Sequence, residues 1–152
     1  MITLQSIKAK QDEISKMILS FEQQPSEIEY LFPETQISLK PDEHYAGLIL
    51  GKDGESSYHL ILLPEDKSDI NWNDAIVWAK QQGGDLPNRR EQALLYANLK
   101  EHFEERSYWS NTHHASHSDY AWYQNFHNGY QSGWTKLDEL RARAVRRLLV
   151  IQ

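Results

Sequence analysis

Histidine and acidic residues gather in one stretch of the chain and could bind a metal. His113, His114 and His117 are followed by Asp119, with His127 nearby. Imidazole nitrogens and carboxylate oxygens are common ligands of zinc and other transition metals. Serine, alanine and asparagine surround these histidines, which is typical of a surface loop rather than of a rigid metal site. We therefore predict no metal and no cofactor, and keep a metal-dependent enzyme that uses the loop of His113, His114 and His117 as the weakest alternative.

A serine close to these histidines is the other candidate for catalysis. Ser110 could serve as a nucleophile with a nearby histidine as its base. No nucleophile elbow or oxyanion-hole motif accompanies it. The chain of 152 residues has no cysteine, which excludes thiol nucleophiles, thiolate metal sites and disulfides. The sequence thus predicts that the protein is not an enzyme.

Aromatic residues alternate with small polar residues through the same part of the chain. Rigid amphipathic rings supply contact area at low entropic cost, and small polar residues adapt their hydrogen bonds to a ligand. Two interpretations stay open: a surface that recognises a protein or a glycan, or rings that fill the core. The candidate ligand-binding residues are His113, His114, His117, Tyr120, Tyr123, Tyr130 and Trp134.

Arginines cluster near the end of the chain, at positions 141, 143, 146 and 147. Alternate residues of a strand point to opposite faces, so these arginines cannot all serve one basic surface. We predict that Arg143 or Arg146 forms an internal ion pair with a carboxylate such as Glu91. The net charge of -6, from 22 acidic and 16 basic residues, argues against general nucleic-acid binding.

A β-hairpin is the first element expected of the domain that carries these residues. Residues 45–50 and 58–63 are apolar and rich in β-forming types, and Asp53-Gly54 between them is a hairpin turn signal. Pro64 is expected to end the second strand, because proline cannot donate a hydrogen bond to the sheet.

Two helices should follow the hairpin. Asn71 is a suitable N-cap for the first, and Gly83-Gly84 supplies its C-terminal stop. Asn88 can cap the second helix, where Glu91 completes a box-like pair. Its apolar stripe consists of Leu95, Leu99 and Phe103.

Beyond Arg106 the composition predicts short strands joined by long loops. Residues 120–126 alternate in type and are expected to form one of these strands. We predict that Trp122 and Phe126 point into the core.

The N-terminal segment has an apolar pattern of its own, over a helix from about Thr3 to Gln23. Its residues are spaced alternately three and four apart, which is the a/d seam of a coiled coil. We favour a short coiled coil that makes a homo-oligomer, and the alternative is a helix that packs on its own domain. Residues 1–24 would then form the helix, 25–42 a linker and 43–152 the domain. The seam residues are Leu4, Ile7, Gln11, Ile14, Ile18 and Phe21.

Several spaced residues, together with these elements, resemble a known family. Their order is similar to that of a bacterial and phage domain family of unknown function, which has the C-type-lectin-like fold of the formylglycine-generating enzymes. The same residues resemble the C-terminal domain of a bacterial collagen-like adhesin. The match covers residues 43 to 149, and with its N-terminal helix the chain looks most like a small protein of tailed phages and prophages. The matching residues are Trp72 and Ala75, Gly83-Gly84, Leu86-Pro87, Tyr108-Trp109-Ser110, Ala121-Trp122, Phe126 with Gly129, and Arg143-Ala144-Val145-Arg146-Arg147.

The resemblance implies an α+β, C-type-lectin-like domain with two helices and short antiparallel strands, preceded by the N-terminal amphipathic helix. It also implies a strand over residues 142–149, after a loop or short turn at 137–141. Apolar spacing alone would favour a helix there. The helical pattern consists of Leu137, Leu140, Ala144, Leu148 and Ile151.

Known activities of that fold do not carry over to this chain. Trp72-Asn73-Asp74 has the letters of the calcium-binding tripeptide of true C-type lectins. In those lectins the tripeptide lies late, beside a Glu-Pro-Asn or Gln-Pro-Asp loop that this chain lacks. Formylglycine formation uses cysteines, and the iron-dependent sulfoxide synthases need an additional metal-binding domain for which the chain has no room.

Residues and resemblance together predict a non-catalytic binding module, encoded by a phage or prophage, that recognises a protein or glycan through the loops between Tyr108 and Leu137. The alternative is an intracellular inhibitor of a host defence or regulatory protein. Residues 1–10 hold no signal-peptide-like stretch, and no apolar run is long enough for a bilayer. We expect the bacterial host cytoplasm as its location during expression, leave association with the virion open, and predict no membrane partner.

Overall fold

Helix α1, Leu4–Glu22, belongs to the first of two units into which the chain divides, Met1–Glu34 and Thr35–Gln152. The computed structural model describes residues 1–29 and 31–150. Thr3 caps α1: its hydroxyl accepts a hydrogen bond from the Ser6 N–H at 3.2 Å, and the Ser6 hydroxyl accepts one from the Thr3 N–H at 3.1 Å. None of the α1 residues is buried. The helix occupies the span predicted from its apolar spacing.

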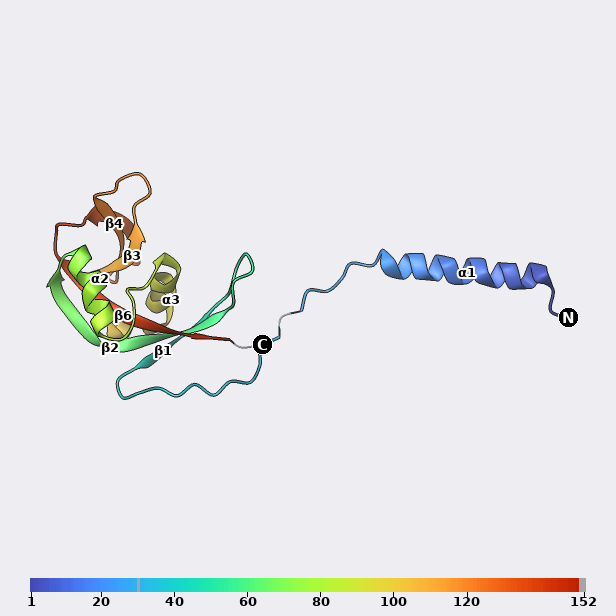
Figure 1. The fold of residues 1–152 in the computed structure, drawn as a ribbon, viewed down its shortest axis with the longest axis horizontal. Coiled ribbons are helices and arrows are strands. Elements are labelled where there is room, and N and C mark those ends of the chain that lie inside the picture. The colour runs from blue at the N-terminus through green and yellow to red at the C-terminus, as the bar shows by residue number, and fades with distance from the viewer. Residues whose placement is uncertain (30, 151–152) are drawn as a thin grey trace. The chain divides into compact units, whose positions relative to one another are not determined.

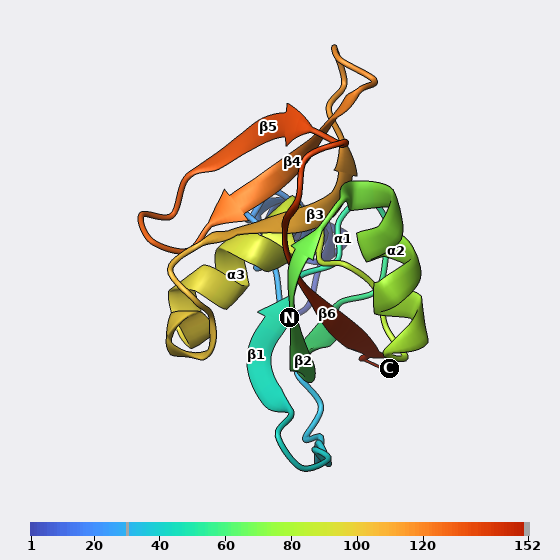
Figure 2. The same cartoon turned by 90° about the vertical axis from the view of Figure 1, so that its left-hand side faces the viewer.

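Six strands form one sheet in the second unit, in the order β1-β2-β6-β3-β4-β5 (Figures 1 and 2). The pairings are antiparallel except that of β3 with β6. This unit is an α+β fold, as predicted. The strands are β1 His44–Ile49, β2 Tyr58–Ile70, β3 Ser107–His113, β4 Tyr120–Asn125, β5 Gln131–Thr135 and β6 Leu140–Leu149.

Two helices lie on opposite faces of this sheet (Figure 2). Helix α2, Trp72–Gln81, packs in one buried cluster with Trp109 of β3. Helix α3, Arg89–Leu99, packs in a second cluster with Tyr108, the neighbour of Trp109 on the same strand. Successive side chains of a strand point to opposite faces, so the two clusters lie on the α2 side and the α3 side of the sheet. Within the described part of the chain, none of the helices has the length and apolar character of a bilayer span.

Asparagine caps begin both helices, as the sequence predicts. The Asn71 Oδ1 accepts from the Asp74 N–H at 3.0 Å. Asn88 and Glu91 form a reciprocal box, with the two backbone N–H groups donating to the side chains at 2.8 and 2.9 Å. After α2, Gly83 has a φ of 89°, a left-handed conformation that glycine adopts without strain.

The predicted hairpin of β1 and β2 is confirmed, with Asp53 and Gly54 at positive φ in its turn. The prediction that Pro64 ends the second strand is wrong, because β2 continues past it. The pairing of β2 with β6 shifts between Leu62 and Asp66. Pro64 therefore lies where the ladder is already interrupted, and its missing N–H costs no hydrogen bond.

Residues 142–149 are a strand, as the resemblance implies. Strand β6 begins earlier, however, so Leu140 and Arg141 belong to it and not to a loop. Both residues pair across the sheet, Leu140 with Ile70 and Arg141 with Tyr108. Ile151, part of the competing helical pattern, lies outside the described residues.

Two aromatic residues lie elsewhere than predicted. Phe103 follows a short 3-10 turn, Lys100–His102, and is therefore outside α3, although it packs partly buried against the α3-side cluster. Trp122 is half-buried at the margin of the α3 side and is not a core residue. Phe126, predicted to point inward, is buried in the α3-side cluster.

Candidate functional site

Helix α3 covers only part of its side of the sheet, and β4 presents side chains beyond it. Ala121 is completely buried in the α2-side cluster. Alternation along β4 therefore places Tyr120 and Trp122 on the α3 side. Tyr120 is 39% exposed, and Trp122 is half-buried. We call the surface made by the following five residues the aromatic face: Arg89, His114, His117, Tyr120 and Trp122.

Trp122 is the centre of the aromatic face. The Arg89 guanidinium carbon lies 3.6 Å from the centroid of its ring, where the ring quadrupole attracts a cation. The His114 imidazole stacks on Trp122, with centroids 5.1 Å apart and planes inclined by 14°. His117 in turn lies 5.2 Å from His114 and 5.7 Å from Tyr120, centroid to centroid. The five side chains thus form one continuous set of contacts.

Two residues of β5 determine where these side chains lie: Gly133 leaves space for His114, and Gln131 hydrogen-bonds to Arg89. Gly133 pairs with Trp122 in the sheet, and a Cβ there would lie 2.8 Å from the His114 Cδ2. Glycine therefore leaves room for the imidazole. The Gln131 amide nitrogen donates to the Arg89 carbonyl oxygen at 2.7 Å, and its Oε1 accepts from the Arg89 Nε at 3.1 Å. These two bonds fix Arg89 above the indole ring.

The Arg89 guanidinium forms no ion pair within residues 1–29 and 31–150. Its side-chain hydrogen bond goes to a neutral amide, that of Gln131. A guanidinium fixed in this way can take a carboxylate from a ligand through its remaining N–H groups. The aromatic face therefore presents one guanidinium among rings, on a chain with a net charge of -6.

His113 lies apart from the aromatic face, although it adjoins His114 in the sequence. Its Nδ1 is 2.8 Å from the Lys136 Nζ, and its ring lies 4.7 Å from that of Trp72, on the α2 side. The two histidines thus occupy different faces. No group of three His, Cys, Asp or Glu side chains in the described residues is placed to hold a metal ion. The metal-dependent alternative therefore has no ligand set there.

Two of the remaining predicted ligand-binding residues, Tyr123 and Trp134, lie on the α2 side of the sheet, because they share a face with the buried Ala121. Tyr123 packs partly buried against the α2-side cluster. Trp134, 46% exposed, donates its Nε1 hydrogen to Asp138 at 2.7 Å. Tyr130 is 71% exposed in the turn between β4 and β5. Of the seven predicted residues, the structure brings His114, His117 and Tyr120 together.

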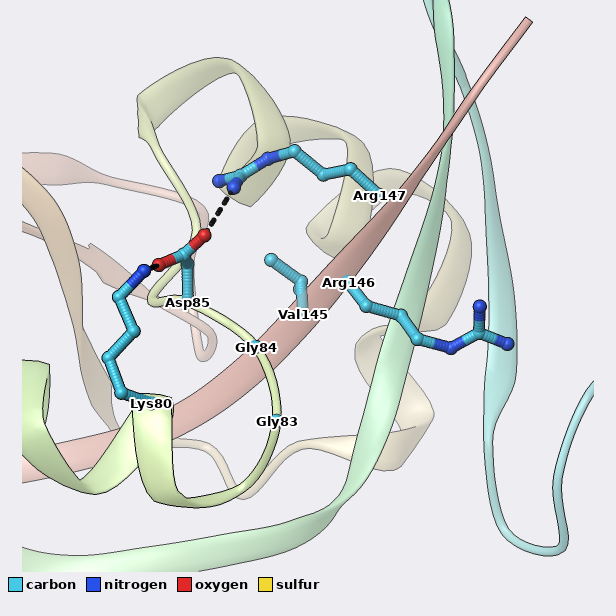
Figure 3. Close-up of a pocket in the computed structure, with 7 residues that line it drawn as sticks. All are labelled: Lys80, Gly83, Gly84, Asp85, Val145, Arg146 and Arg147. Carbon is cyan, nitrogen blue, oxygen red and sulfur yellow. Dashed lines mark hydrogen bonds and ion pairs between the residues drawn. The ribbon is translucent and has the colours of Figure 1, made fainter.

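A pocket of about 420 Å³ lies between the end of α2 and β6 (Figure 3). Lys80 and Arg147 both reach the carboxylate of Asp85, while Arg146 points away from it. Because these charged groups satisfy one another, we assign the pocket a structural role. It is lined by Lys80, Gly83, Gly84, Asp85, Val145, Arg146 and Arg147.

The C-terminal arginines bind within the domain, in part as predicted. Arg146 pairs with a carboxylate, that of Glu43, at 2.8 Å. Glu91 forms an ion pair with Arg147, and not with Arg143 or Arg146 as predicted. The Arg147 Nε lies 2.6 Å from the Glu91 Oε2. Arg143 is buried, and burial lowers its pKa. It donates to the carbonyl oxygens of Leu63, Pro64 and His102.

Acid is expected to destabilise the second unit through two of these carboxylates. The Arg146 hydrogen bond lowers the pKa of Glu43 below 4.5. Burial raises the pKa of Asp85, but the hydrogen bonds from Lys80 and Arg147 more than offset it, so that pKa falls below 3.8. A carboxylate whose pKa is lower in the folded than in the unfolded protein stabilises the fold. This contribution is fully present above the unfolded-state pKa and is lost as the pH falls through the folded-state pKa.

We therefore expect the urea midpoint of unfolding to be nearly constant from about pH 7 to about pH 5 and to fall by about pH 3. The double variant Glu43→Gln, Asp85→Asn should be less stable at neutral pH and lose less on acidification. An equal loss in both proteins would contradict this assignment.

Sequence reasoning missed Arg89 and Trp122 as members of the site. One signal was present: Tyr120 and Trp122 are two residues apart in a strand and share a face, whereas Ala121 suits the packed side. No local pattern places Arg89 beside them, because the contact joins the start of α3 to β4. Neither a protein-family model nor a curated protein matches the sequence.

Proposed function

We propose that the chain is a non-catalytic binding module of C-type-lectin-like architecture, encoded by a phage or prophage, and that its aromatic face recognises a protein. The origin and the architecture rest on the resemblance of the spaced residues. The order of elements, with a hairpin, two helices, three short strands and a final strand, is in keeping with it. We also propose that α1 joins copies of the chain, because its apolar seam is exposed.

The continuous contact of rings and guanidinium on the aromatic face carries this proposal. Tryptophan, tyrosine and arginine are the residue types enriched where protein interfaces gain most of their affinity. Arg89 already lies over the Trp122 ring, on a surface that a sugar would need for stacking. This favours a protein over a glycan. Because the guanidinium lacks an ionic partner in the described residues, we expect a carboxylate on the ligand.

An inhibitor of a host defence or regulatory protein would use the same surface, since it too binds a protein. The identity of the partner separates these two roles. A virion or cell-surface protein would indicate recognition of the host, whereas a cytoplasmic host protein would indicate inhibition. The physical basis of binding is the same in both.

Replacing Trp122 with alanine is expected to lower the amount of partner protein bound to the chain at least about tenfold. The change removes the ring that both Arg89 and His114 contact. The measurement is affinity purification from bacterial lysate with the tagged full chain, followed by mass spectrometry. Trp134→Ala is the matched control, since this exposed ring pairs with Ala121 and so lies on the α2 side, off the aromatic face. Circular dichroism verifies that both variants are folded.

Three outcomes would contradict the proposal. The first is a partner that Trp122→Ala retains but Trp134→Ala loses. The second is purified glycan that binds the wild type and competes with the retained protein. The third is retention that does not fall as salt rises, because an ionic contact of Arg89 should be screened.

A further inference from the structure

Helix α1 has a repeating apolar seam, and its side chains are exposed. The exposed fractions are 47% for Ile7, 55% for Ile14 and 53% for Ile18. In heptad notation, position a is occupied by Leu4, Gln11 and Ile18, and position d by Ile7, Ile14 and Phe21. A seam of this period is complementary to a second copy of itself, because knobs at a and d fit the holes of an equivalent helix.

One polar residue, Gln11, interrupts this seam and distinguishes the two possible orientations. In a parallel, in-register assembly each Gln11 faces the Gln11 of other copies, and their amides can hydrogen-bond to one another. In an antiparallel assembly the seam places Gln11 opposite Ile14 of the other copy. The buried amide would then lose its hydrogen bonds. The seam therefore favours the parallel orientation.

The residues that flank the seam are compatible with this orientation. In a parallel assembly, position g of one helix meets position e of the next heptad on its neighbour. These pairs are Lys10 with Ser15, and Met17 with Glu22. Neither brings like charges together, so no repulsion opposes parallel pairing.

The distribution of branched residues bears on the number of helices. Isoleucine occupies position d in the first two heptads, and the apolar residues at position a are one leucine and one isoleucine, with Phe21 at the last d position. Isoleucine at d, with either leucine or isoleucine at a, shifts the preference from two strands to three or four.

We infer that α1 joins three or four copies of the chain in a parallel bundle. This inference rests on the self-association included in the proposed function and adds its orientation and number. Each assembly would carry several aromatic faces, so that weak single contacts add up to strong attachment on a repetitive surface.

Multi-angle light scattering of the full chain tests the number of copies. We expect three to four times the 17.8 kDa of one chain, with dissociation on dilution because a bundle of about three heptads is short. The triple variant Leu4→Ser, Ile14→Ser, Ile18→Ser should be monomeric, and Lys16→Ser, on the outer face, should assemble like the wild type. A monomer or a dimer at high wild-type concentration would overturn the inference.

Single cysteines test the orientation cleanly, because the chain has none of its own. In a parallel bundle, Ile18→Cys forms a disulfide with itself on oxidation. In an antiparallel one, it cross-links only with Ile7→Cys. Gln24→Cys tests the orientation without altering the seam. The two ends of a helix of 19 residues are about 28 Å apart. Antiparallel copies would place their two cysteines at opposite ends of the bundle, too far apart to form a disulfide. Failure of Gln24→Cys to cross-link in an assembled sample would overturn the parallel arrangement.

These results are separable from those on the aromatic face. A monomer that still shows Trp122-dependent retention would refute the bundle alone. An assembled protein without such retention would refute the recognition proposal alone.

Discussion

Replacing Glu91 with alanine is expected to lower the free energy of unfolding by about 3–5 kcal/mol. The Glu91 carboxylate has no exposed surface. It accepts two hydrogen bonds from the Arg147 guanidinium, at 2.6 and 2.8 Å, and one from the Tyr58 hydroxyl at 2.8 Å. The same carboxylate accepts the Asn88 N–H that begins α3. Its loss would leave a guanidinium with fewer partners and a helix without half of its cap.

Urea unfolding followed by circular dichroism would measure this loss. Lys80→Met is the matched control. Lys80 pairs with Asp85, but its side chain is 66% exposed, so we expect a change below about 1 kcal/mol. The double variant Glu91→Leu, Arg147→Met should recover part of the loss, because it also removes a largely buried guanidinium that would keep only its bond to Asp85 among its present ion pairs. A cost of Glu91→Ala similar to that of the control would show that the pair is not a stabilising contact.

Gly84→Ala is expected to destabilise the second unit by about 3 kcal/mol, through a backbone clash. A Cβ at this position would fall on the Val145 carbonyl oxygen and lie 2.9 Å from the Leu63 Cδ1. The next residue, Asp85, exchanges two backbone hydrogen bonds with Val145, at 3.0 and 2.8 Å. The methyl group would therefore separate the end of α2 from β6, where these bonds join them.

Gly83→Asn is the control for this clash. A Cβ at Gly83 meets nothing within 4 Å, and asparagine tolerates the left-handed conformation of this position. We expect it to cost less than about 1 kcal/mol, measured by the same urea unfolding. Equal losses for the two variants would show that conformational freedom, and not contact with Val145, explains the paired glycines.

Local features of the fold were predictable because their causes lie within a few residues. Asn71 and Asn88 bond to N–H groups three residues ahead, and Asp53-Gly54 turns the hairpin through its own backbone. Such signals depend on residue type and short spacing alone. They fix where elements begin and end.

Features that depend on the pairing of distant segments were not predictable in the same way. Pro64 is tolerated in β2 because the register with β6 shifts at that point. Glu91 pairs with Arg147, not with Arg143 or Arg146, because the pairing of β6 with its neighbours decides where each arginine lies along the sheet. Arg143 shares the face of Arg147 but reaches the carbonyl oxygens of Leu63 and His102 instead. The aromatic face has the same cause, since Arg89 and Trp122 meet only after α3 has packed beside β4.

Strand β6 follows the other strands in sequence but lies between β2 and β3 in the sheet. During synthesis the β1–β2 hairpin and the β3–β4–β5 segment are made before the strand that joins them. Both clusters of the core contain β6 residues, Ala144 in one and Val145 in the other. The domain therefore cannot fold progressively as the chain leaves the ribosome. Its folding waits for β6 to emerge and is then governed by contacts between segments far apart in sequence, which form slowly.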